Sequence, residues 1–151
     1  MKTRKSSIEQ FLLQKKIAVL GVSRSGKKFG NSVMQDLQQK GYQTFAVNPY
    51  ANEINGRPCY ASLESLPEKM DGVVFVIPPE ETEKQLPAVS KLGIRHVWLQ
   101  QGSESKKAID FCDKNNINYV AGECIFMFNE PVTSFHKFHQ WIWKLLGKLP
   151  K

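Results

Sequence analysis

Three cationic side chains gather in a short turn after Leu20, and this turn has the residues of the sequence best suited to bind an anion. An apolar run, residues 17–20, precedes the turn, which is rich in Gly, Ser and Lys. Arg24, Lys27 and Lys28 carry the positive charge, and the backbone N–H groups of a following helix would add to it. The turn is therefore predicted to bind a phosphorylated ligand.

Two known motifs fit this turn only in part. A Walker A loop would begin at Gly21 and include Lys27, but Lys28 stands where a Ser or Thr must bind Mg²⁺. The third apolar run ends in Pro78-Pro79 without an acid to hold a metal, so NTP hydrolysis is not expected. A nucleophile elbow would need a glycine at the position of Ser25.

The dinucleotide fingerprint G-x-G-x-x-G fits the turn better than these two motifs. Gly21 and Gly26 correspond to its first and third glycines, and Ser23 replaces the second. The serine side chain leaves less room for a pyrophosphate to approach the backbone, but its hydroxyl group adds a hydrogen-bond donor. Gly21 is expected to leave room for that approach. An ordinary tight turn before a helix is the alternative interpretation.

The elements that would position this turn are predicted from the apolar pattern. Short apolar runs alternate with helical patterns along the chain, which is typical of a parallel sheet covered on both faces. Segment 52–60 is expected to be a loop or a small hairpin outside the core. The predicted fold class is α/β, a Rossmann-like, doubly wound, parallel five-stranded sheet with an additional C-terminal helix. The five predicted strands are 17–20, 43–47, 73–77, 95–100 and 118–121.

Polar or Pro-rich segments follow four of these strands, and such segments are where α/β sheets bind ligands. They are residues 21–26, 48–50, 78–79 and 101–102, and they are expected to meet in one crevice. A nicotinamide-binding fold normally has an acid about 20 residues after its glycines. Asn48 lies there instead, which weighs against NAD, although Asn48-Pro49 is also a common start of a simple turn.

These four segments resemble the motifs of a known family. The pattern Val19-Leu-Gly-x-Ser23, Val47-Asn-Pro49, Val76-Ile-Pro-Pro79 and Val97-Trp-Leu-Gln-x-Gly102 resembles the small CoA-binding domain proteins. It is similar, more remotely, to the CoA-binding domain of the succinyl-CoA synthetase alpha subunit. The resemblance covers about residues 12–128, and all four motifs occur in this order.

The resemblance implies that the ligand is coenzyme A or an acyl-CoA. The glycine turn would hold the phosphates, and the segment after the second strand would flank the nucleotide. The Pro-rich segment would line the pantetheine path, and the turn after the fourth strand would border its far end. Which of the two lysines meets which phosphate stays open. The predicted ligand-binding residues are Gly21, Val22, Ser23, Arg24, Lys27, Lys28, Asn48, Pro49, Ile77, Pro78, Pro79, Gln101 and Gly102.

A non-catalytic binding protein is expected rather than an enzyme. The synthetase subunit uses a phosphorylated histidine in a second domain, and this sequence offers no corresponding region. The predicted strand ends carry no Ser/His/Asp or Cys/His group, and no metal site is expected. The alternative is an NAD(P)-binding oxidoreductase or a dinucleotide-sensing Rossmann protein, of which the oxidoreductase would need a further substrate domain.

Composition and charge exclude several other classes. The chain has 151 residues, a length that suits one α/β domain, and it lacks an apolar run long enough to span a membrane. Its three cysteines form no CxxC pair, so a cytoplasmic location is expected. The net charge of +7 comes from the two ends, since residues 1–16 carry five Lys or Arg against one acid and residues 131–151 carry four Lys and none. Without a recognised motif, this charge does not indicate nucleic-acid binding.

The chain is divided into three predicted parts. Residues 1–16 form a basic helical segment, residues 17–128 the ligand-binding domain, and residues 129–151 an amphipathic helix packed on that domain. Phe135, Phe138, Ile142 and Leu146 give this last helix an apolar stripe. It is expected to contribute to a possible homodimer, whereas contact with a membrane is not expected.

Overall fold

The structure is a computed structural model that describes residues 5–128. The predicted helix over residues 129–151 lies outside the described residues, and so do the hypotheses on its packing, on a homodimer and on membrane contact. None of the described helices is long and apolar enough to cross a membrane.

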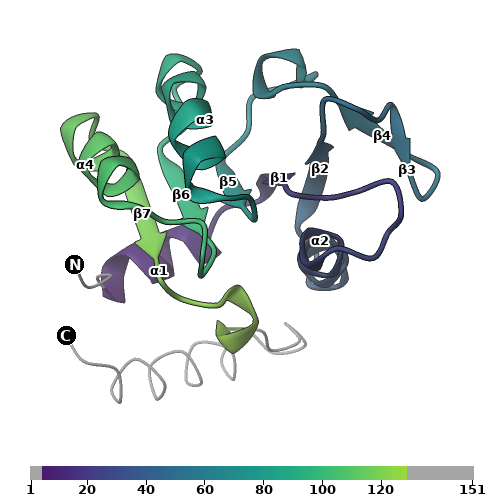
Figure 1. The fold of residues 1–151 in the computed structure, drawn as a ribbon. Coiled ribbons are helices and arrows are strands. Elements are labelled where there is room, and N and C mark those ends of the chain that lie inside the picture. The colour runs from purple at the N-terminus through teal and green to yellow at the C-terminus, as the bar shows by residue number, and fades with distance from the viewer. Residues whose placement is uncertain (1–4, 129–151) are drawn as a thin grey trace.

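A single seven-stranded sheet runs through the described part of the chain (Figure 1). The strand order is β3-β4-β2-β1-β5-β6-β7, and every neighbouring pair is parallel except β3 and β4. The predicted doubly wound parallel sheet is thereby confirmed. The strands are β1 (Lys16–Leu20), β2 (Gln43–Val47), β3 (Glu53–Ile54), β4 (Arg57–Tyr60), β5 (Gly72–Phe75), β6 (His96–Leu99) and β7 (Asn118–Ala121).

The predicted number of five strands is wrong, because segment 52–60 joins the sheet. This segment is the expected small hairpin, formed by β3 and β4. Its second strand continues the sheet beside β2, where Cys59 pairs with Ala46. Ile54 and Cys59 are buried in the core, so the hairpin extends the core instead of lying outside it.

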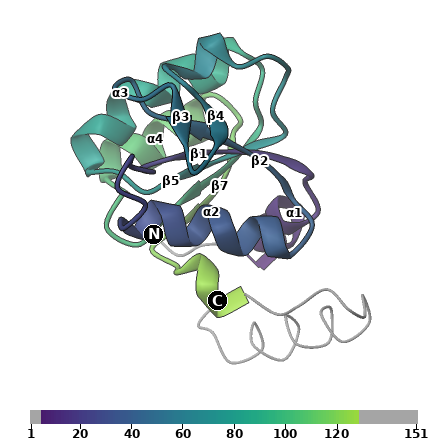
Figure 2. The same cartoon turned by 90° about the vertical axis from the view of Figure 1, so that its right-hand side faces the viewer.

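Helices cover both faces of the sheet (Figures 1 and 2). Ile8 and Phe11 of α1 and Val33 of α2 pack in the core on one face, against Ile17 and other strand residues. The core on the opposite face contains residues of α3 and α4, such as Leu86 and Ala108. The helices are α1 (Lys5–Leu12), α2 (Phe29–Gln39), α3 (Pro79–Lys91) and α4 (Lys106–Lys114), with the short 3₁₀ helices η1 (Leu63–Ser65) and η2 (Ile125–Phe128).

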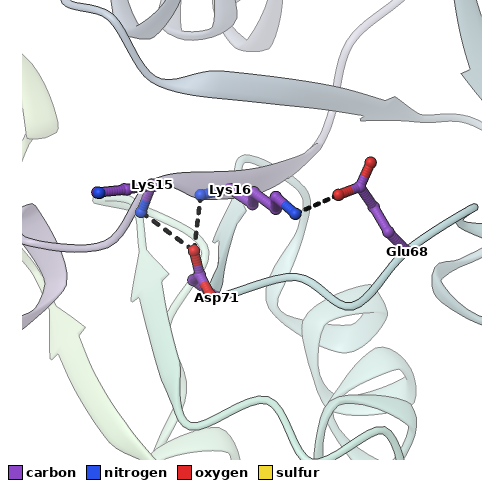
Figure 3. A network of polar contacts seen from close by, with 4 residues as sticks. All are labelled: Lys15, Lys16, Glu68 and Asp71. Carbon is purple, nitrogen blue, oxygen red and sulfur yellow. Dashed lines mark hydrogen bonds and ion pairs between the residues drawn. The ribbon is translucent and has the colours of Figure 1, made fainter.

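Asp71 joins the starts of two central strands (Figure 3). Its Oδ2 accepts hydrogen bonds from the backbone N–H groups of Lys15 and Lys16, at 3.2 and 2.9 Å. Its own backbone N–H donates to the carbonyl of Lys16 at 2.9 Å. The Lys16 ammonium forms an ion pair with Glu68, which also raises the pKa of that lysine. β1 and β5 are therefore held together at the edge of the sheet opposite to their carboxyl ends.

We expect Asp71→Ala to lower the free energy of unfolding by about 2 kcal/mol, because hydrogen bonds to a charged acceptor are lost and two amides lose their partner. Urea denaturation measures this change. Asp113→Ala is the matched control, since Asp113 is an exposed aspartate near the end of α4. Equal stability of the two variants would show that the Asp71 bonds contribute nothing.

Candidate functional site

An open pocket of about 460 Å³ lies at the carboxyl edge of the sheet, where β1, β2, β4 and β5 end. The segments after these strands form its wall together with the first turns of α3, as expected for an α/β sheet. The lining residues are Leu20, Gly21, Val22, Lys28, Val47, Asn48, Pro49, Tyr50, Ala61, Ser62, Val76, Ile77, Pro78, Glu81 and Gln85.

Seven of the predicted ligand-binding residues line this pocket, and six do not. The seven are Gly21, Val22, Lys28, Asn48, Pro49, Ile77 and Pro78. Ser23, Arg24 and Lys27 lie in the loop that leads to Lys28, and Pro79 is the first residue of α3. Gln101 and Gly102 form an exposed turn after β6 that the structure does not bring into the pocket.

Gly21 and Gly30 allow three backbone segments to meet at the end of β1. Gly21 has a φ of +111°, and a Cβ placed on it would lie 2.1 Å from the carbonyl oxygen of Val76. A Cβ on Gly30, in the first turn of α2, would lie 2.3 Å from the carbonyl oxygen of Gly21. The end of β5 and the start of α2 are thus in contact with the same glycine.

This contact gives a structural reason for Gly21 and corrects the expected role of Gly26. The space beside Gly21 is filled by Val76 of this protein, so the missing side chain is already explained without a bound pyrophosphate. Gly26 is not the glycine that packs the helix on the strand, because a Cβ there would meet only the Asn55 side chain, at 3.6 Å. Gly30 has that role, so the loop is longer than the fingerprint assumes.

Asn31 holds the loop at Ser23. Its Oδ1 accepts a hydrogen bond from the Ser23 backbone N–H at 2.9 Å, and its Nδ2 donates to the Ser23 carbonyl at 3.0 Å. Asn31 is buried in the first turn of α2, so a single side chain fixes both backbone groups of Ser23 to the helix. The chain from Arg24 to Lys28 is mostly exposed.

Asn48 connects the loops that follow β1 and β2. Its Nδ2 donates to the carbonyl of Val22 at 2.9 Å, and its Oδ1 accepts from the backbone N–H of Tyr50 at 2.8 Å. An ionised aspartate could make the second bond but could not donate the first. This explains why an amide stands where nicotinamide-binding folds have an acid.

The two helices that begin at the pocket differ in charge. The first turn of α2 contains no acid, and Lys28 precedes the helix without a side-chain cap. The first turn of α3 contains Glu80 and Glu81, and the latter forms an ion pair with Lys84 at 3.2 Å. The loop cations, Arg24, Lys27 and Lys28, form no ion pair with any residue that the structure describes. An anion is therefore favoured at α2 and disfavoured at α3.

Sequence reasoning missed several residues that shape the site. Ser103 is buried, and its hydroxyl accepts a hydrogen bond from the Ile77 backbone N–H at 3.1 Å, which fixes the segment after β5. Such bonds join residues far apart in the chain and leave no local pattern. Tyr50 could have been predicted as a lining residue, because it directly follows the predicted Asn48-Pro49 pair. The other unpredicted lining residues with polar side chains are Ser62, Glu81 and Gln85.

The described pocket wall has few groups that could perform catalysis. Glu81 is its one acid, and neither His nor Cys is among its lining residues. Cys59 of β4 is not among the lining residues, and burial raises the pKa of its thiol and so disfavours the reactive thiolate. Within residues 5–128, no group of three His, Cys, Asp or Glu side chains is arranged to hold a metal ion.

A mostly parallel sheet with helices on both faces and a pocket at the carboxyl ends of its central strands defines a Rossmann-like fold. The sequence profile of the CoA binding domain family matches residues 15–130, and the chain belongs to this family. The family resemblance stated from the sequence is thereby confirmed.

Known relatives extend this comparison. The chain is 25% identical over 135 residues to an ADP-forming acetate–CoA ligase I of Archaeoglobus fulgidus, with 83% of this chain and 20% of the ligase covered. It is 33% identical over 108 residues to a glyceraldehyde-3-phosphate dehydrogenase 2 of Methanosarcina barkeri, with 70% and 30% covered. A hypothetical protein from Pyrococcus horikoshii has a similar structure, with a TM-score of 0.77, 27% identity, and 95% and 99% covered. The chain therefore spans about a fifth of the ligase, the first of these relatives.

We expect Gly21→Ala to lower the free energy of unfolding by more than about 4 kcal/mol, because the new Cβ would overlap the Val76 carbonyl. Gly102→Ala is the control, since Gly102 has a similar φ of +95° but open space around it. There only the backbone strain remains, about 1–2 kcal/mol. Chemical denaturation of both variants measures the difference, and equal losses would contradict the close contact at Gly21.

Proposed function

We propose that the protein binds coenzyme A or an acyl-CoA without catalysing a reaction of it. The observation that carries this proposal is the division of one pocket into a cationic part at Lys28 and α2 and an apolar part at Val76, Ile77 and Pro78. CoA has the matching division, since its phosphates carry the charge and its pantetheine is a thin, partly apolar chain. The family to which the chain belongs supports the same ligand.

The phosphates would bind at the loop of residues 21–28 and at the first turn of α2. Lys28 lines the pocket, and Arg24 and Lys27 are exposed in the same loop. Ser23 would act through the backbone conformation that Asn31 imposes on it. Asn48 and Pro49 would flank the nucleotide, while Gln101 and Gly102 would meet the ligand only beyond the pocket. Pro79 would contribute by starting α3.

A non-catalytic role is proposed because neither His nor Cys is among the described lining residues and Glu81 is the one acid there. Ligation of acetate to CoA is the activity named for the Archaeoglobus relative, and this chain corresponds to a fifth of that enzyme. A reducing cytoplasm is the location that fits best, since Cys59, Cys112 and Cys124 are free thiols.

Binding of NAD(P) is the second candidate, and the match to a dehydrogenase is the observation in its favour. It is not favoured here, because both polar atoms of the Asn48 amide are already bonded to the protein. No acid in the described pocket wall lies on the segment after β2, where ribose hydroxyls are usually held.

We expect CoA and acetyl-CoA to bind more tightly than NADH or NADPH in isothermal titration calorimetry. Because phosphate contacts at partly exposed lysines are screened by ions, the affinity for CoA should fall from low to high salt. Tighter binding of NADPH than of CoA would contradict the proposed ligand and favour the dinucleotide instead.

A charge variant tests the placement of the phosphates. Lys28→Ala should weaken CoA binding about tenfold, the effect of one charge-assisted hydrogen bond. Lys107→Ala is the control, because Lys107 is equally a surface lysine but lies on α4, outside the pocket. If the two variants bind CoA with the same affinity as the original protein, the phosphates lie elsewhere.

A further inference from the structure

Tyr50 is the most exposed large apolar or aromatic side chain in the described part of the chain, and it lies on the pocket wall. Its exposed fraction is 81%, against 58% for Leu13 and 46% for Phe29. Phe29 packs against the ring of Phe126, with the centroids 5.1 Å apart. No aromatic contact is present for Tyr50 among the described residues, so its ring faces are available to a ligand.

The backbone of Tyr50 is fixed relative to the loop that carries the cations. Its N–H donates to Asn48 Oδ1 at 2.8 Å, and the same amide group donates to the Val22 carbonyl at 2.9 Å. One asparagine therefore joins the base of the tyrosine to the segment that would hold the phosphates. The ring of Tyr50 is exposed while its backbone is held by a hydrogen bond, and this arrangement suits a surface on which a ligand stacks.

The order of the strands places Tyr50 on one side of the phosphate loop. Across the carboxyl edge of the sheet the strands follow one another as β4, β2, β1 and β5, with neighbouring strands about 4.8 Å apart. The glycine loop follows β1. On the β5 side the wall is formed by Val76, Ile77 and Pro78, with Glu81 and Gln85 of α3 beside them. The wall on the β2 and β4 side includes Tyr50 and Ser62.

A ligand whose phosphates bind at β1 must extend to both sides. The segment after β5 is apolar, and Glu81 beside it disfavours a phosphate. No aromatic side chain is present in the described wall on this side, so it suits a thin uncharged chain. The β2 side offers an aromatic ring, which stacks well on a planar base. We propose that Tyr50 is the stacking platform for the adenine ring of the bound ligand. This inference rests on the proposed CoA binding and adds the orientation of the ligand and a residue that determines its affinity.

The test compares ligands that contain and lack the base. Calorimetry is carried out on the full chain with CoA, adenosine 3′,5′-bisphosphate and 4′-phosphopantetheine. Tyr50→Ala should weaken the first two about tenfold, the usual effect of removing one base–aromatic stack, and leave 4′-phosphopantetheine unchanged. Because the Tyr50 side chain is mostly exposed, the melting temperature should stay near that of the original protein.

Two further variants separate stacking from other contacts of the tyrosine. Tyr50→Phe keeps the ring and should bind CoA nearly as well as the original protein. Tyr50→Leu keeps apolar surface without a ring and should bind as weakly as Tyr50→Ala. Binding to the original protein should also reduce the ultraviolet absorption of the adenine, and this change should be lost in Tyr50→Leu.

The outcomes distinguish this inference from the function on which it rests. If the original protein does not bind CoA, the proposed function fails. If it binds CoA and Tyr50→Ala binds equally well, the platform is refuted while CoA binding stands. If Tyr50→Ala weakens the binding of 4′-phosphopantetheine as much as that of CoA, Tyr50 lies on the pantetheine side. If Tyr50→Phe binds CoA as weakly as Tyr50→Ala, the effect belongs to the hydroxyl group. Either result overturns stacking.

Discussion

The site depends on a close contact between backbones at the end of β1. Gly21 lies against the carbonyl of Val76, and Gly30 lies against the carbonyl of Gly21. Side chains at these two positions would push β5 and α2 away from β1. Because they are absent, the apolar segment after β5 and the positive start of α2 are held at the same strand end. The pocket has its two unlike parts for this reason.

The central sheet could be predicted because its strands are buried on both faces. Such strands have continuous apolar runs, as in residues 17–20 and 73–75, and these are visible without any structure. The hairpin of β3 and β4 gave no such signal. Only Ile54 and Cys59 are buried in it. Pro58 pairs with Glu53 of β3 and precedes the first residue of β4 that pairs with β2, which is Cys59, so a proline is tolerated there. Its place in the sheet is set by tertiary pairing with β2.

The site was predictable where its residues directly follow a strand and unpredictable where they act from elsewhere. Gly21, Asn48 and Pro78 were predicted to lie together because the carboxyl ends of parallel strands meet at one edge, and all three line the pocket. Asn31 and Ser103 were not, since each binds the backbone of a distant segment and its type is common in ordinary surface positions. The packing role of Gly30 also depends on a contact that sequence spacing alone does not specify.

The charges at the starts of α2 and α3 make the two ends of the pocket electrostatically different. Both α2 and α3 begin at the carboxyl edge, and the dipole of each helix alone would favour an anion there. Glu80 and Glu81 place negative charge in the first turn of α3, whereas α2 has Lys28 before its first turn and no acid within it. In the proposed complex, the phosphates would therefore lie at α2, and the uncharged chain would pass α3. Asn48 fixes the loops after β1 and β2 to each other, so the side of the pocket at β2 keeps a defined position relative to the loop proposed to hold the phosphates.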